Sequence, residues 1–327
     1  LFIPLKRIVD QHRLPGRFVL TGSANVLSLP RLAESLAGRM EIHTLWPLAQ
    51  AELHNASHTF IDHAFAGTLP PSQATIGHKA LVKQVLAGGY PDIIRRATES
   101  KRDSWCAAYL QTLLQRDVRD LTHIERLDEI PKLLHLLATR VAGIMNSSEL
   151  SRSSGLPNTT LKRYLTLLET LYLYVTLPPW SGNLSKRLIK SPKVYLNDTR
   201  LLGYLLGISP THVLSKRSIF GRILENFVVM ELKKQQTWAN THTHMCYYRT
   251  HSGEEIDIVL EAFDGRKVVI EVKASQTVSD QDFKHIRAFQ KALPNEDIPG
   301  FVVYMGQTTI PWAKNLTAIP LPSLWLG

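Results

Sequence analysis

The spacing of apolar residues divides the chain into a mainly helical first part and a last third in which short strands predominate. The chain opens inside a helical pattern with no capping residue before it, so we expect a fragment that enters in mid-helix. Residues 17–24 and 40–45 have the apolar character of buried strands, and residues 28–36 that of a short helix. Residues 49–115 are mostly helical, with turn signals where glycine and proline gather.

The middle of the chain predicts three helices followed by a β-hairpin. Residues 130–141 and a segment opening at Ser147 are the first two helices, and Asn158 is the expected N-cap of the third. Strands are expected at 172–177 and 193–196. The third helix has a buried stripe formed by Leu161, Leu165, Leu168 and Leu171. This order is typical of a winged helix-turn-helix.

The last third predicts a helix, three strands, a second helix and a fourth strand. Their expected ranges are 220–235, 244–249, 255–261, 267–273, 279–293 and 300–305. An Asp-Gly pair at Asp264 joins the second and third strands as a tight hairpin turn. This element order is that of a restriction-endonuclease-like core.

Charged residues interrupt the apolar pattern on two neighbouring strands. Asp257 is expected on the face opposite Ile256, Ile258 and Leu260. Glu271 and Lys273 share one face of the next strand, and the hairpin brings them beside Asp257. Glu255 shares the face of Asp257, either as a further ligand or as polarity at a strand end. A solvated sheet face is the alternative explanation of such alternation.

Two carboxylates and a lysine at one edge of a sheet are suited to phosphodiester hydrolysis, because the carboxylates hold Mg²⁺ and the lysine neutralises developing charge. The pattern resembles the PD-(D/E)xK nuclease superfamily. That resemblance implies a metal site, with Mg²⁺ or Mn²⁺ held by Asp257, Glu271 and the carbonyl of Val272. It implies Lys273 as a catalytic residue, joined by Glu225 from the preceding helix.

Four stretches elsewhere resemble prokaryotic AAA-type ATPases related to the archaeal ATPases. They are Phe18-Val19-Leu20-Thr21-Gly22-Ser23-Ala24, Ser35-Leu36-Ala37-Gly38-Arg39, Leu45-Trp46-Pro47-Leu48 and Gly88-Gly89-Tyr90-Pro91. The resemblance places Thr21, Ser23 and Asn25 in the sensor region beside a nucleotide and assigns Arg39 a phosphate contact. An ordinary strand-to-helix turn is the alternative for the Thr-Gly-Ser segment.

The phosphate loop of such ATPases, Gly-x-x-x-x-Gly-Lys-Ser/Thr, does not occur in this sequence, and neither does the acidic strand that orients Mg²⁺. Both would lie upstream of Leu1. Because the loop's backbone N–H groups and lysine hold the phosphates, we do not expect this chain alone to bind or hydrolyse ATP well. ATP is expected as a ligand of full-length relatives.

The formal net charge is +10, which fits a polyanionic partner such as nucleic acid and equally fits a basic surface without a specific partner. The candidate DNA contacts are Lys162 and Arg163 on the third helix and Lys186 and Arg187 before the second hairpin strand. A winged helix that only packs between domains is the alternative. The sequence has no membrane-spanning apolar run and no signal peptide, and its two cysteines lie far apart, so we expect a cytoplasmic protein. AAA relatives often assemble, which makes a homo-oligomer a further expectation.

The sequence thus predicts a multidomain α/β protein. Its parts are the end of an ATPase core (1–48), a helical lid (49–128), a winged helix (129–205) and a nuclease-like domain (206–327). The expected function is a DNA-associated, ATPase-family protein with a metal-dependent nuclease-like domain. The alternatives are a non-catalytic regulatory protein that binds ATP or DNA and has a dormant nuclease fold, and a remnant reading frame without activity.

Overall fold

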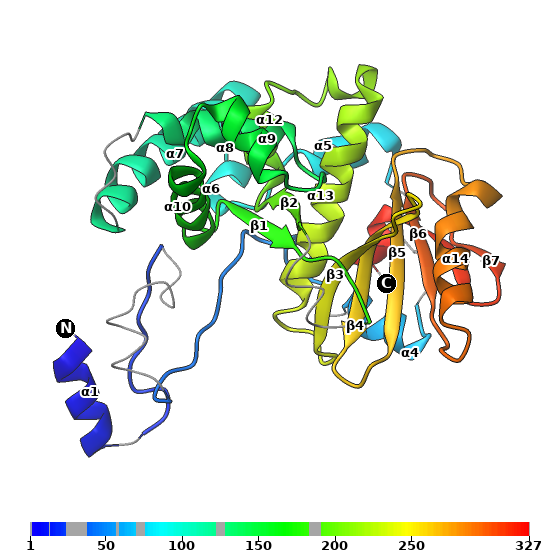
Figure 1. Ribbon diagram of the computed structural model, residues 1–327, viewed down its shortest axis with the longest axis horizontal. Coiled ribbons are helices and arrows are strands. Elements are labelled where there is room, and N and C mark those ends of the chain that lie inside the picture. The colour runs from blue at the N-terminus through cyan, green and yellow to red at the C-terminus, as the bar shows by residue number, and fades with distance from the viewer. Residues whose placement is uncertain are drawn as a thin grey trace.

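The computed structural model describes residues 2–12, 14–23, 38–56, 59–69, 76–121, 128–182 and 191–326. Helices gather on one side of the molecule and a six-stranded mixed sheet on the other, with helix α13 (Arg217–Gln235) between them (Figure 1). The protein is therefore of mixed α/β class, as the sequence predicts.

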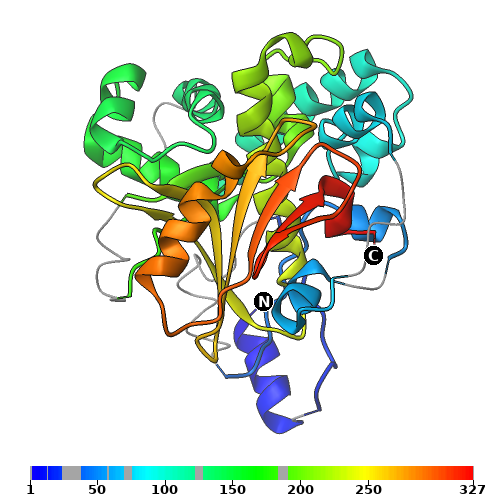
Figure 2. The same ribbon diagram turned by 90° about the vertical axis from the view of Figure 1, so that its right-hand side faces the viewer.

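The N-terminal segment contains one helix and, within its described residues, no strand. Helix α1 (Phe2–Gln11) lies apart from the sheet and from the other helices (Figures 1 and 2). The predicted strands at 17–24 and 40–45 are wrong for the residues described there, and Val19 and Leu45 are 85% and 94% exposed. An apolar segment forms a strand only beside a neighbour that accepts its hydrogen bonds, and no described strand pairs with these residues. The helix predicted at 28–36 lies outside the described residues.

The following part is helical, as predicted, and consists of five helices in the described residues. They are α3 (Gln50–Leu53), α4 (Phe60–Ala66), α5 (His78–Val85), α6 (Pro91–Ile94) and α7 (Glu99–Leu121). Helix α4 begins where the Thr59 hydroxyl accepts a hydrogen bond from the Asp62 amide, and it ends at Gly67 in the left-handed conformation. None of the helices in the described ranges combines the length and the apolar character needed to cross a membrane.

The middle part has the predicted order of three helices and a hairpin. Its elements are α8 (Glu129–Thr139), α9 (Ser147–Ser154), α10 (Asn158–Thr170), β1 (Tyr174–Leu177) and β2 (Lys193–Leu196). The expected leucine stripe of α10 is buried. One detail is wrong: Pro157 occupies the N-cap of α10, and Asn158 is already its first helical residue. Proline lacks the N–H that a helix start leaves unpaired, so it fits this position.

Helices α12 (Thr199–Leu205) and α13 lead into the six-stranded sheet, whose order is β3-β4-β5-β6-β8-β7. The strands are β3 (Thr243–Arg249), β4 (Glu255–Ala262), β5 (Lys267–Lys273), β6 (Gly300–Tyr304), β7 (Ile310–Ala313) and β8 (Leu316–Pro320). The predicted second helix is a 3₁₀ turn, η3 (Asp280–Phe283), followed by α14 (Lys284–Ala292). Helices α13 and α14 cover opposite faces of the sheet (Figures 1 and 2). Strands β7 and β8 were not predicted.

A bulge in β4 changes the side-chain pattern next to Asp257. Cys246 pairs with Val259 and Tyr248 with Ile256, so Tyr247 alone lies opposite two residues of β4, Asp257 and Ile258. The prediction that Ile256 and Ile258 share a face is therefore wrong. Ile258 packs in the core beneath α13, whereas Ile256 packs in the core beneath α14.

Buried polar side chains at the end of α13 hold the segment that precedes α3. The Lys234 ammonium donates to the Leu48 carbonyl at 3.1 Å and contacts the Glu231 carboxylate at 2.8 Å. The backbone amide of Gln50 donates to the other carboxylate oxygen of Glu231 at 2.7 Å. Each partner thus satisfies a group that would be costly to bury unpaired.

Gln235 extends this connection to α4 and to the end of the chain. Its side-chain carbonyl accepts from the Phe60 amide at 2.9 Å, and its NH₂ group donates to the Leu324 carbonyl at 2.6 Å. One continuous apolar core includes residues from Ala51 to Trp325 and crosses the predicted boundaries at 128 and 205. The helical parts after residue 48 and the sheet are therefore packed as one body in the described residues.

A second junction joins two of the motifs that resemble ATPases. The Leu48 amide donates to the Gly89 carbonyl at 2.8 Å, and the Gly89 amide donates to Asp198 at 2.7 Å. Asp198 also caps α12 by accepting from the amides of Arg200 and Leu201. A Cβ at Gly89 would lie 2.2 Å from the Leu48 carbonyl oxygen, so only glycine fits there.

Asp62 connects α4 to the turn before β3 and makes the stability of this contact depend on pH. Its carboxylate accepts from the Thr59 hydroxyl at 2.6 Å, the Asn240 amide at 3.1 Å and the Thr241 amide at 2.7 Å. Burial alone would raise the pKa of Asp62, but these hydrogen bonds lower it to about 2. Its stabilisation is therefore fully present above the ordinary value of 3.8 and is lost as the pH falls towards 2.

We expect Asp62→Asn to lower the free energy of unfolding by roughly 1 kcal/mol at neutral pH, because the amide replaces a charged acceptor at a partly exposed site. The difference between variant and parent should narrow between about pH 4 and pH 2 as the parent's carboxylate is protonated. Urea unfolding over this pH range measures it. A difference that stays constant with pH would contradict the assigned role of the Asp62 charge.

Candidate functional site

A buried lysine lies among three carboxylates where the hairpin meets α13 and the sheet. The Lys193 ammonium is 2.6 Å from Glu255, 2.9 Å from Glu225 and 3.6 Å from Asp257. The Lys193 side chain is 2% exposed, so these carboxylates rather than water solvate its charge. The cluster joins β2, α13 and β4, three elements that are distant in sequence.

The hairpin strand β2 is fixed in this position by hydrogen bonds to α13. The Asn226 side chain accepts from the Leu196 amide at 2.7 Å and donates to the Leu196 carbonyl at 2.9 Å. Tyr195 donates its hydroxyl to Glu225 at 2.7 Å. Lys193 and Tyr195, two residues apart on one strand, therefore both reach the same carboxylate.

The second half of the cluster lies where β4 and β5 separate. The last Cα pair between these strands is Ile258 with Ile270, and beyond it Asp257 accepts from the Val272 amide at 2.9 Å. Glu271 forms an ion pair with Lys273 at 3.0 Å. At the point where the strands separate, the Asp257 carboxylate thus takes the place of a backbone carbonyl as the acceptor for the Val272 amide.

Burial and mutual repulsion shift the acids of this cluster towards their neutral forms. Burial and the neighbouring Asp257 raise the pKa of Glu225 to about 7, although Lys193 and Tyr195 favour its charged form. Burial and Asp257 raise the pKa of Glu271 well above its ordinary value, against the effect of Lys273. These pKa shifts lower the negative charge that the ammonium groups of Lys193 and Lys273 must balance.

In contrast to the acids, Lys193 and Lys273 are shifted towards their charged forms. Burial alone would lower the pKa of Lys193, but Glu225, Asp257 and Glu255 raise it far above the ordinary value. Burial likewise opposes the charge of Lys273, and Glu271 and Asp257 raise its pKa. Both side chains are therefore permanent cations of the site.

The oxygen donors of the cluster are chemically suited to a hard divalent cation, but their arrangement in this structure is organised around ammonium groups. Lys193 lies between Glu225 and Glu255, and Lys273 is paired with Glu271. Among the described residues, no group of three or more His, Cys, Asp or Glu side chains is placed to hold a metal ion.

The structure brings together the whole set that the sequence predicts for the C-terminal site. Its members are Glu225, Asp257, Glu271, Val272 and Lys273. Sequence reasoning missed Lys193 and Tyr195, which come from the hairpin. Their signal was weak: a lysine and a tyrosine two residues apart in the apolar strand β2 mark a polar face, but not its partner.

The other predicted site residues lie elsewhere. Thr21 and Ser23 are exposed and belong to no helix or strand, and Arg39 forms an ion pair with Asp10 at 2.6 Å. Lys162 and Arg163 are exposed on α10. The remaining predicted contacts, Asn25, Lys186 and Arg187, lie outside the described residues.

Comparison with protein families relates the start of the chain to ATPases. Residues 1–54 match the model of an AAA domain. Residues 78–212 and 220–324 match two domains of unknown function, DUF8612 and DUF4143. The protein is thus an AAA-related α/β protein, and the candidate cluster joins the two regions of unknown function, with Lys193 from the first and the acids from the second.

Several curated proteins are similar to most of this chain. An uncharacterised protein of Mycobacterium tuberculosis and one of Mycobacterium bovis are each 28% identical over 321 residues, which is 98% of this chain. An uncharacterised protein of Methanocaldococcus jannaschii is 24% identical over 279 residues, 84% of this chain and 58% of its own length. The chain spans 65% of the length of the mycobacterial relatives. No solved structure matches it.

Proposed function

We propose that the C-terminal region is a nuclease-type domain of the PD-(D/E)xK class, in a DNA-associated protein related to AAA ATPases. The observation that carries the proposal is the grouping of Asp257, Glu271 and Lys273 at the point where β4 and β5 separate. Glu225 lies beside them on the preceding helix. The order of helix, three strands, helix and strand around them supports the same class.

In this class Asp257, Glu271 and the Val272 carbonyl would hold Mg²⁺ or Mn²⁺, which polarises a phosphoryl oxygen and activates water when bound. Lys273 would place a positive charge beside the phosphate. The donor chemistry fits such an ion, but the carboxylates are arranged around lysines.

The middle region suits the nucleic-acid partner in this proposal. The three helices α8, α9 and α10 with the hairpin have the layout of a winged helix, whose third helix enters the major groove in DNA-binding members. Lys162 and Arg163 are exposed on α10, and a net charge of +10 favours a polyanion. Nucleotide binding is proposed only for longer relatives that supply a phosphate loop.

A second candidate is a non-cleaving binding module with a dormant nuclease fold. It is favoured by Lys193, which neutralises Glu225 and Glu255 from within the protein. A buried ammonium among the acids gives the cluster a structural role even when no metal takes part.

Plasmid cleavage separates the two candidates. Incubation of the chain with supercoiled plasmid and with single-stranded DNA, in Mg²⁺ or Mn²⁺, should yield nicked or shortened products. Asp257→Ala and Lys273→Ala should each slow cleavage by about a hundredfold or more, because each removes a group placed at the reacting phosphate. Asp264→Ala, at the exposed hairpin turn, is the control that should leave the rate unchanged. DNA binding without cleavage by the parent would favour the binding module.

A further inference from the structure

A cavity of about 510 Å³ lies between β1, α13 and β3, and none of the acids of the cluster lines it. Its lining is largely apolar and includes Val175, Leu177, Val229 and Met245. The polar side chains along it are those of Thr176, Lys233, Gln236, Thr243 and His244. A cavity of this size and lining is typical of a binding site rather than of a packing defect.

Strands β1 and β3 each form a wall of this cavity, and they are joined beside it. The Tyr247 amide donates to the Pro178 carbonyl at 3.0 Å, and the Tyr247 carbonyl accepts from the Trp180 amide. Pro179 and Tyr247 form an isolated parallel bridge. The chain after β1 is thus joined to β3 at residues 178–180, and the lining residues of both strands lie next to that junction.

The β3 wall presents an open strand edge to the cavity. His242 accepts a hydrogen bond from Phe263 on the β4 side, so the alternation of a strand turns the backbone of Thr243 and Met245 to the other side. Gln236 donates to the Thr243 carbonyl at 2.8 Å. Within the described residues, no hydrogen bond is found for the outward amide of Met245.

The β1 wall presents a second open edge. Leu173 accepts from the Asn197 amide on the β2 side, and Pro178 accepts from Tyr247 on the cavity side. The backbone of Thr176, two residues before Pro178, therefore also points to the cavity. No described residue pairs with it. In the described residues, two strand edges that lack a neighbouring strand consequently border one cavity, and such edges readily pair with another chain.

The cavity also holds a cation without a counter-ion. Lys233 on α13 is half-buried and forms no hydrogen bond or ion pair with the described residues. Burial lowers the pKa of Lys233, and no charged neighbour among the described residues opposes that shift. Its neighbour Lys234, in contrast, is fully paired. An occupant that carries a carboxylate would satisfy Lys233.

We propose that this cavity binds an extended peptide segment of a partner protein, which adds a strand between β1 and β3. The backbone of the segment pairs with Thr176 and Met245, its apolar side chains contact the walls, and a carboxylate binds Lys233. Each wall contributes four residues, which corresponds to a segment of about four to five residues at the rise of a strand. The proposal is independent of nuclease activity.

The test is selection of random heptapeptides displayed on phage against the immobilised 327-residue chain. The expected peptides alternate apolar with polar residues and contain a carboxylate. On binding, amide hydrogen exchange in residues 174–177 and 243–246 should slow by about tenfold or more, because new backbone hydrogen bonds protect both edges.

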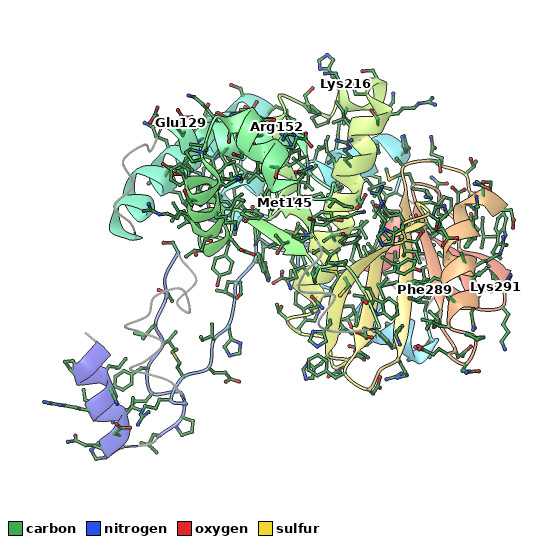
Figure 3. The ribbon with its side chains drawn as sticks, in the orientation of Figure 1. Glu129, Met145, Arg152, Lys216, Phe289 and Lys291 are labelled. Atoms are coloured by element: carbon green, nitrogen blue, oxygen red, sulfur yellow. The ribbon has the colours of Figure 1, made fainter. Side chains whose placement is uncertain are left out.

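Two pairs of variants make the test specific. Lys233→Gln should weaken binding by about tenfold, whereas Lys291→Gln, on the outer side of α14, should not (Figure 3). Thr176→Pro removes the edge N–H and should weaken binding, whereas Thr176→Val removes only the hydroxyl that reaches Glu169 and should not. Circular dichroism melts check that each variant is folded.

Three outcomes would overturn the proposal. Selection that enriches no peptide would do so, as would peptides whose affinity is unchanged by both Lys233→Gln and Thr176→Pro. The third is saturation of the cavity by dodecanoate, measured by calorimetry, with no selected peptide competing for it. That result would assign the cavity to a small amphipathic acid instead.

Discussion

Lys193→Met should lower the free energy of unfolding by about 3–5 kcal/mol, among the largest effects of any single substitution in this protein. The substitution removes the ammonium that lies within 2.6–3.6 Å of Glu255, Glu225 and Asp257. Methionine keeps most of the side-chain volume, so the loss is electrostatic rather than a cavity effect. Urea unfolding at neutral pH measures it.

Lys267→Met is the matched control, because Lys267 is also a buried lysine of the sheet but its nearest partner, Glu296, is 37% exposed. Its cost should be clearly smaller, since water can solvate the carboxylate left behind. Mn²⁺ should stabilise Lys193→Met more than the parent, because the carboxylates then lack their cation. Equal losses for the two lysines would show that Lys193 does not hold the cluster together.

Asp198→Ala is expected to destabilise the protein by roughly 3–5 kcal/mol. Asp198 is buried and accepts hydrogen bonds from three backbone amides, at Gly89, Arg200 and Leu201. Alanine leaves all three unpaired and also removes the cap of α12. Thermal and urea unfolding measure the loss.

Asp198→Asn should cost less than Asp198→Ala, because its single carbonyl oxygen keeps part of the hydrogen bonding. Asp264→Ala is the exposed comparison: this turn residue also accepts from a backbone amide, at Arg266, but its loss should change stability by about 0.5 kcal/mol or less. A small effect at Asp198 would mean that the contact at Gly89 does not anchor the helices.

Local patterns sufficed to predict most elements after residue 49, because helix and strand periodicities there coincide with burial. Strand β5 and strand β2 begin and end where the pattern indicates. The predictions of strands at 17–24 and 40–45 were wrong, because apolar character alone supplies no pairing partner. Strands β7 and β8 were missed since proline and short length obscure their alternation.

The acidic side of the candidate site was predictable because its residues lie on adjacent strands joined by a tight turn. Lys193 was not, because its position depends on how β2 packs against α13, a contact between residues thirty or more positions apart. The bulge at Asp257 was hidden for a similar reason: it is a property of the β3–β4 register, which one strand's sequence does not specify.

Helix α13 has a consequence for how this protein can be divided. Family models treat residues 78–212 and 220–324 as separate units, yet Glu231, Lys234 and Gln235 obtain their buried partners from residues 48–60. A fragment that begins at α13 would lack residues 48–60. It would therefore expose these polar groups and the apolar residues packed around them. We therefore expect residues 220–324 to need residues 48–60, or another surface in their place, in order to fold.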